Sequence, residues 1–203
     1  MDKTDLNHLI GETLALEAED AKKAGTIGYM ARMLVQATMP HKATKDVLFK
    51  RENGAFRLSI VSPDGLPYGS IPRLLLSWMT TEAVRTRSPV LLLGTSLSSF
   101  MAELDLGRRG GKRGDITRFK NQAERLFSST ISCRYKDENL THGKGFLIAD
   151  EYNLWWSPKK PDQLPLWKST ITLSQRFFEQ IIDKPVPVDM DAMMKLKRSP
   201  MAL

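Results

Sequence analysis

Cationic and amide side chains that suit contact with a polyanion concentrate between Gly107 and Arg125. This segment holds seven lysines and arginines against two carboxylates, in a chain whose formal net charge is +7. Its first part, GRRGGKRG, interleaves glycine with four cations, Arg108, Arg109, Lys112 and Arg113. Because flexible backbone lets such side chains follow a path of phosphates, the pattern predicts backbone contact with nucleic acid. The alternative is a mobile, solvated loop.

The second part, DITRFKNQAERLF, has the periodicity of an amphipathic helix with Asp115 as its expected cap. Its apolar residues recur at helical spacing, as Ile116, Phe119, Ala123 and Leu126. The opposite face is expected to carry Arg118, Asn121, Gln122 and Arg125, with Thr117 beside them. Arginine bonds guanine bidentately, and asparagine and glutamine do so with adenine, so these types suit a DNA major groove. A merely solvated surface helix is the alternative.

A nucleotide-hydrolysing site is not indicated. GRRGGKR superficially resembles a phosphate-binding P-loop, but Gly107 and Gly111 are one residue too close together. Arg113 also stands where a serine or threonine would hold magnesium, and a helix rather than a strand precedes the segment. The glycines therefore predict a turn between helices.

Catalytic constellations are missing from the sequence. His8, His41 and His142 are far apart, and no cysteine or carboxylate spacing suggests zinc. There is no G-x-S-x-G elbow and no histidine pair of the kind that a DNA-nicking enzyme needs. We therefore expect no enzyme, no cofactor and no metal.

The elements that position the cationic segment follow the order of a winged helix. Helices are expected near residues 71–87, 96–104 and 115–128, with a short strand at Val90–Leu93 between the first two. Strands at 130–136 and 144–156 follow, joined by the turn DENLTHG. This order predicts an α+β winged helix-turn-helix over about 70–156. Lys144, next to that turn, is a candidate wing contact with DNA.

The flanking segments predict additional elements. A hairpin is expected over 46–61 with its turn at Asn53-Gly54, a strand over 166–173 and a helix over 174–183. Helical signals run from 4 to 38, with an interruption at Gly25 and Gly28. After the interruption an apolar helix is expected over 29–39, and the segment suits a docked arm or a dimer contact. Trp155, Trp156 and Trp167 are expected to pack in a core or an interface rather than to stack on single strands.

These patterns predict three parts: a helical arm over 1–40, the winged-helix domain with hairpin additions over 41–184, and a linker leading into a further helix over 185–203. Pro185 and Pro187 mark that linker. No apolar run approaches the length of a membrane span, and the N-terminus lacks the pattern of a signal peptide. With Cys133 the only cysteine, a cytoplasmic location is expected.

From Tyr68 onward the chain resembles the plasmid replication initiator family usually called RepA. The resemblance is carried by three segments, PYGSIPRLLLSWMTTEAVRTRSPVLLLGTSLSSFMAEL, GRRGGKRGDITRFKNQAERLFSSTISC and PVPVDMDAMMKLKRSPMAL. It implies a protein that binds repeated sites in double-stranded DNA at a plasmid origin, helps to melt the duplex and recruits the host replicative helicase machinery. It also implies two tandem winged helices and an exchange between homodimers and monomers.

The resemblance further implies a division of labour between the two winged helices. The first usually supplies dimerisation and backbone contacts, and the second reads bases. Arg108, Arg109, Lys112, Arg113 and Arg118 would then mainly grip phosphates. MDAMMKLKRSPMAL resembles the opening of the second winged helix. These 203 residues are therefore expected to be a truncated, N-terminal portion of an initiator, and the alternative is a C-terminus that differs from those of its relatives.

Two other functions fit the same residues. One is a winged-helix repressor that acts on its own promoter. The other is a protein-interaction or dimerisation module that does not touch DNA.

Overall fold

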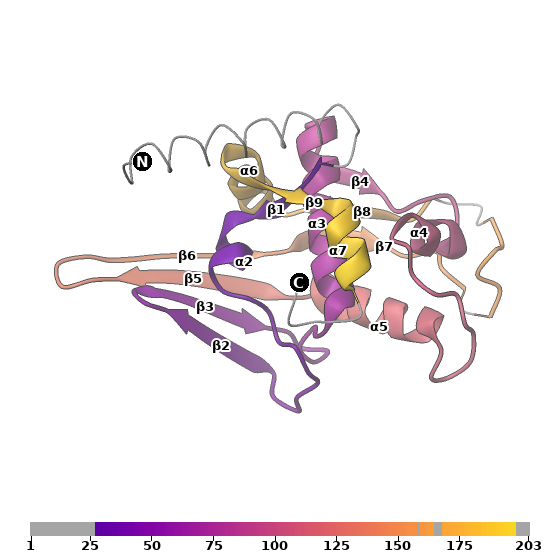
Figure 1. Ribbon diagram of the computed structural model, residues 1–203, viewed down its shortest axis with the longest axis horizontal. Coiled ribbons are helices and arrows are strands. Elements are labelled where there is room, and N and C mark those ends of the chain that lie inside the picture. The colour runs from indigo at the N-terminus through magenta and orange to yellow at the C-terminus, as the bar shows by residue number, and fades with distance from the viewer. Residues whose placement is uncertain (1–26, 158, 165–167, 198–203) are drawn as a thin grey trace, which may run out of the picture.

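The computed structural model describes residues 27–157, 159–164 and 168–197, and its elements are arranged around α3 (Ser70–Thr86). Figure 1 shows this helix in the middle of the molecule, with sheets and helices on several sides of it. Ten of its seventeen residues are buried, including Leu74, Leu75 and Met79. A helix with so broad an apolar surface is stable only when other elements cover it.

A three-stranded sheet and two further helices pack with α3. The helices are α4 (Leu97–Glu103) and α5 (Asp115–Phe127), and the antiparallel sheet has the order β4-β8-β7. Its strands are β4 (Val90–Leu92), β7 (Ala149–Asn153) and β8 (Thr170–Leu173). The partner of β4 is β8, which lies after residue 156 and so outside the interval 70–156 that was predicted for a winged helix.

A second sheet has four antiparallel strands in the order β2-β3-β5-β6. They are β2 (Leu48–Asn53), β3 (Phe56–Val61), β5 (Thr130–Lys136) and β6 (Thr141–Leu147). The predicted hairpin over 46–61 is confirmed, but its turn is Gly54-Ala55, since Asn53 pairs with Phe56. Gly54 has the positive φ, 56°, that a tight hairpin turn requires. The β5–β6 hairpin extends away from the helices (Figure 1).

The single strand predicted over 144–156 is two strands, β6 and β7, which belong to different sheets. The chain changes sheets at Ile148, whose side chain is fully buried. The Ile148 N–H donates to the Ser129 carbonyl at 3.0 Å, and the Ile148 carbonyl accepts from the Ser174 N–H at 3.1 Å. Alternation of apolar residues continues through this point, so the sequence pattern alone could not reveal the change.

The N-terminal part of the described chain pairs with the C-terminal part. Strand β1 (Ile27–Ala31) is antiparallel to β9 (Pro185–Asp189), and the short helix α2 (Arg32–Gln36) follows β1. The predicted helix over 29–39 is therefore wrong at its start, and the predicted linker at Pro185 and Pro187 is a strand. The helical signals before residue 27 lie outside the described residues.

Two C-terminal helices agree with the sequence. Helix α6 (Gln175–Asp183) begins after Ser174, whose Oγ accepts from the Phe177 N–H at 3.2 Å. Helix α7 (Met190–Leu196) begins after Asp189, whose carboxylate accepts from the Ala192 N–H at 3.0 Å. The start of α7 lies against β1, because the missing Cβ of Gly28 leaves room for the Met190 side chain.

Aromatic rings join α3, α4 and α5 in the core. Phe100 contacts Trp78, Phe119 and Trp156 with ring centroids 4.7, 5.8 and 5.9 Å apart. Trp156 is buried, as expected for a core residue, whereas Trp155 is about half exposed and Trp167 lies outside the described residues. This packing fixes the position of α5 relative to α3 and α4.

Candidate nucleic-acid interface

Between α4 and α5 the cationic segment is a folded loop rather than an extended one. The Thr117 Oγ1 donates to the Gly111 carbonyl at 2.9 Å, and the Gly114 N–H donates to the same carbonyl at 3.0 Å. A Cβ on Gly114 would lie 2.2 Å from the Gly110 carbonyl oxygen, and Gly111 has φ of 94°. Both positions need glycine, so these two glycines determine the conformation of the turn as well as its flexibility.

Asp115 stabilises this loop in a way that differs from the expected helix cap. The N-cap of α5 is Gly114, which makes no side-chain capping hydrogen bond. Asp115 is the first residue of the helix. Its carboxylate accepts from Arg109 Nε at 2.8 Å and from Arg109 Nη2 at 3.2 Å. These bonds lower the pKa of the Asp115 carboxyl, and the Arg109 side chain remains 84% exposed.

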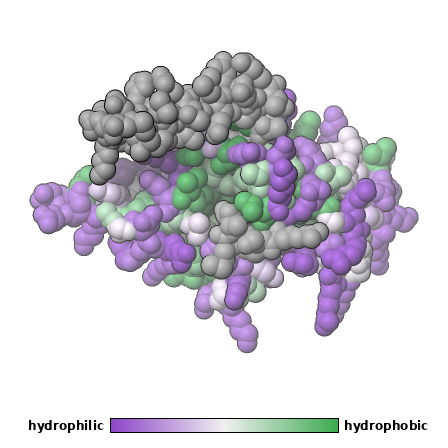
Figure 2. Space-filling model, in the orientation of Figure 1, coloured by the Kyte–Doolittle hydropathy of each residue, from purple (hydrophilic) through white to green (hydrophobic). Residues whose placement is uncertain are grey.

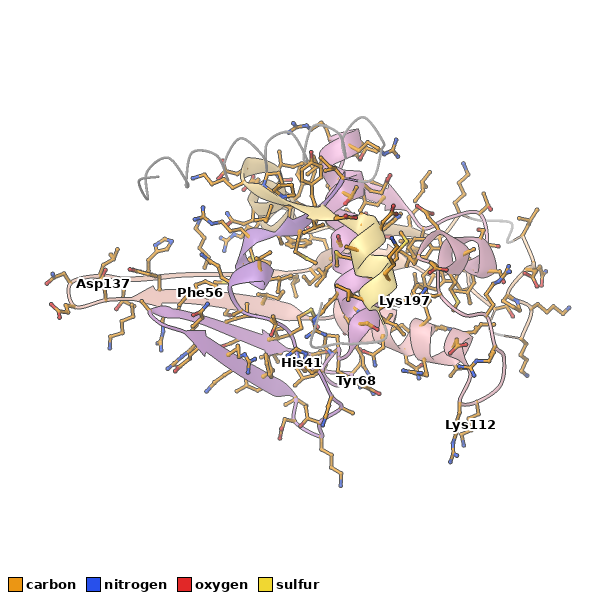
Figure 3. All side chains as sticks on the ribbon, viewed as in Figure 1. His41, Phe56, Tyr68, Lys112, Asp137 and Lys197 are labelled. Carbon is orange, nitrogen blue, oxygen red and sulfur yellow. The ribbon has the colours of Figure 1, made fainter. Side chains whose placement is uncertain are left out.

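The loop cations gather at one corner of the molecule. Arg108, Arg109, Lys112 and Arg113 are all exposed, and α5 adds the exposed Arg118 and Asn121 directly behind them. Figure 2 shows hydrophilic side chains projecting at this corner, where Figure 3 labels Lys112. The structure thus brings six of the ten predicted contact residues together, with Thr117 half-buried beneath them.

Gln122 does not lie on the outer face of α5, and that prediction is wrong. Its side chain is only 6% exposed, and its Oε1 accepts from the Tyr68 backbone N–H at 2.8 Å. Helical spacing places position 122 at the edge of the polar face, where the loop before α3 covers it. The side-chain amide is thus used for an internal contact and is not available to a base.

Arg125 is half-buried and fastens the same loop. Its Nη1 donates to the Leu66 carbonyl at 3.3 Å, and its guanidinium lies 5.9 Å from the centre of the Tyr68 ring. A Cβ on Gly65, where φ is 92°, would lie 3.3 Å from this guanidinium, so a larger residue there would be crowded as well as strained. Gln122 and Arg125 therefore position Tyr68 at the base of α5.

A wide groove separates α5 from the chain that precedes β2. Its volume is about 1000 Å³. One wall carries Arg118 and Asn121, the other carries His41 and Lys42, and Tyr68 and Ser70 form part of the floor. His41 and Tyr68, which lie far apart in sequence, are labelled close together in Figure 3. The wall at 41–43 was not predicted, because no local pattern marks it.

Arg73 holds that second wall in place. This arginine of α3 is 3% exposed, and its guanidinium donates to the carbonyls of Met39, at 2.5 Å, and of Gly69. It also donates to His41 Nδ1 at 3.2 Å. Burial lowers the pKa of Arg73, but these bonds satisfy the guanidinium without a carboxylate.

Lys144 lies apart from the other predicted contacts. It is on β6, opposite Cys133 of β5, and it borders a small cavity of about 280 Å³ with Arg32 and Lys184. The turn predicted to be the wing is the tip of this hairpin. The turn carries Asp137, which Figure 3 places at the opposite end of the molecule from Lys112. This turn belongs to the four-stranded sheet and has no part in the β4-β8-β7 sheet.

Comparison with known proteins identifies the family. The family model described as plasmid-encoded RepA protein matches residues 66–203. The chain belongs to this RepA family. The resemblance predicted from the sequence is confirmed, and membership of a plasmid replication initiator family supports a role in plasmid replication. No curated protein matches the chain.

Among solved structures, this chain is similar to a crystal structure of domains 2 and 3 of RctB. The TM-score is 0.48 at 8% sequence identity, and the match covers 74% of this chain and 62% of that one. The described residues contain no helix with the length and apolar character needed to cross a bilayer. Within the same ranges, no three His, Cys, Asp or Glu residues are grouped as metal ligands would be.

Proposed function

We propose that this chain is a DNA-binding, non-catalytic plasmid replication initiator, and that it binds repeated origin sites in duplex DNA. The observation that carries the proposal is the single corner at which four loop cations adjoin Arg118 and Asn121 of α5. Concentrated positive charge supplies the salt-dependent part of DNA affinity. We also propose that the chain forms homodimers and recruits the host helicase machinery, because the RepA family implies both.

The proposed DNA-binding unit is a winged helix assembled from α3, α4, α5 and the β4-β8-β7 sheet. Helix α4 and helix α5 are joined by the cationic turn, and α5 is the recognition element that faces the duplex. In this arrangement the wing, which is the pair of strands that follows α5 within the β4-β8-β7 sheet, is β7–β8. Phosphate contact is assigned to Arg108, Arg109, Lys112, Arg113 and Arg118, and Asn121 is the remaining exposed candidate for a base edge.

The test is fluorescence-anisotropy titration of the 203-residue chain against origin and scrambled duplexes at several salt concentrations. About five to seven phosphate contacts predict a log–log salt slope of about −5 to −6. Replacing Arg108, Arg109, Lys112 and Arg113 together with alanine should flatten the slope by about three to four units.

A charge-matched control distinguishes local contact from net charge. The control variant replaces four cations of the four-stranded sheet with alanine: Lys50, Arg51, Arg134 and Lys136. It removes the same charge far from the loop, and we expect the log–log salt slope to change by less than one unit. Equal effects of the two variants would contradict the assignment to the loop. Lack of binding to either duplex would favour an interaction module that does not touch DNA.

A further inference from the structure

We propose that the groove between α5 and residues 41–43 seats one strand of the duplex backbone, with Lys42 and Ser70 as phosphate contacts. This inference rests on the proposed DNA-binding function and extends the interface to a wall far from α5 in sequence. It assigns contacts to residues outside the glycine loop and outside the recognition helix.

The charge of the groove supports an anionic occupant. Two carboxylates line it, and both are already paired: Asp115 with Arg109, and Asp105 with Lys197 of the segment after α7. Lys42 and Arg118 both line the groove, and neither forms an ion pair with any described residue. The paired acids therefore leave a net positive lining.

The groove is also built rigidly, which reduces the entropy lost when a ligand binds. Arg73 fixes the chain at 39–41 against α3, and the Gly69 N–H donates to the Pro40 carbonyl at 3.0 Å. On the floor, Tyr68 is fixed by Gln122 and Arg125. One wall and the floor of the groove are thus held by different internal contacts.

Duplex backbone fits the lining better than single-stranded DNA does. Proteins that hold single strands stack successive bases on aromatic side chains. Tyr68 is the one Phe, Tyr or Trp among the described residues that line the groove, and Arg125 lies over its ring. The groove also continues into the cationic loop through Gly107 and Arg109, so a strand gripped by the loop is directed along it.

The experiment compares Lys42→Ala with Lys45→Ala. Both lysines are exposed, they are three residues apart, and only Lys42 lines the groove. Anisotropy titrations with duplex DNA should show a salt slope flattened by about 0.9 for Lys42→Ala, which is about an eightfold weaker affinity at 0.1 M salt. Lys45→Ala should leave both unchanged, and Ser70→Ala should weaken binding in the same direction as Lys42→Ala.

Three outcomes would overturn the inference. If Lys42→Ala leaves the slope unchanged while the four-residue loop variant flattens it, the groove is not used although the proposed function stands. If both lysine variants weaken binding equally, general charge is responsible. If Lys42→Ala weakens binding to a single-stranded oligonucleotide but not to the duplex of the same sequence, the occupant is a single strand. If neither the lysine variants nor the loop variant changes DNA binding, the proposed function itself is refuted.

Discussion

Replacing Gln122 tests whether this residue maintains the fold or reads a base. Its Oε1 accepts from the Tyr68 N–H at 2.8 Å, and its side chain is almost completely buried. Gln122→Met keeps nearly the same length and shape but removes the acceptor. A buried donor left without its partner costs about 1–3 kcal/mol. Gln122→Ala also loses buried methylene surface, at about 0.8 kcal/mol per group.

The expected magnitude follows from these two contributions. We expect the free energy of unfolding to fall by about 1–3 kcal/mol for Gln122→Met and by about 2–4 kcal/mol for Gln122→Ala. In a chain of this size each kcal/mol corresponds to about 2–4 °C in Tm. The neighbouring Asn121 is exposed, so Asn121→Ala should change stability by less than about 0.5 kcal/mol and provides the matched control.

The assay is thermal and urea unfolding monitored by circular dichroism, in the absence of DNA so that ligand binding does not shift Tm. Origin preference is then measured by anisotropy at a temperature where every variant is folded. The reasoning is refuted if Gln122→Met leaves Tm unchanged and abolishes the preference for the origin duplex. That result would make Gln122 a base-reading residue.

Three further predictions concern the cationic loop and the lone cysteine. Gly114→Ala should lower stability by about 1–3 kcal/mol in urea unfolding, because its Cβ meets two carbonyl oxygens, whereas Gly110→Ala, with open space around it, should be tolerated; equal Tm values would contradict this. The pKa of Asp115 is lower in the folded than in the unfolded chain, so the advantage of the native protein over Asp115→Asn should be present above about pH 4 and disappear as pH falls through the folded pKa; a stability difference that does not shrink as the pH is lowered from about 4 would exclude the ion pair as its cause. Burial raises the pKa of Cys133 to about 11, so at pH 8 Ellman's reagent should react more than about 100-fold faster in urea than with the folded chain, and equal rates would show that the thiol is exposed.

Local patterns were sufficient to predict several elements of the fold. The hairpin over 46–61, the helices near 71–87 and 115–128 and the Ser174-capped helix follow from residue periodicity and caps, which act over a few residues. The cationic corner was also predictable, because Arg108, Arg109, Lys112 and Arg113 are adjacent in sequence and no apolar neighbour is available to bury them.

Long-range contacts decided the remainder. Position 29 was predicted to be helical, but the pairing of β1 with β9 places it in a strand, and its partner Pro187 is 158 residues away. The break between β6 and β7 depends on Ser129 and Ser174, which no local pattern connects with Ile148.

The family, the charge of the α4–α5 turn and the amphipathic character of α5 were predictable before folding, since each depends on residue identity and short spacing. Which polar residues of α5 reach solvent depends on tertiary contacts. The loop before α3 covers Gln122 and Arg125 and leaves Arg118 and Asn121 exposed. The groove wall at 41–43 likewise exists because the buried Arg73 binds backbone carbonyls more than 30 residues away, a contact that residue spacing does not encode.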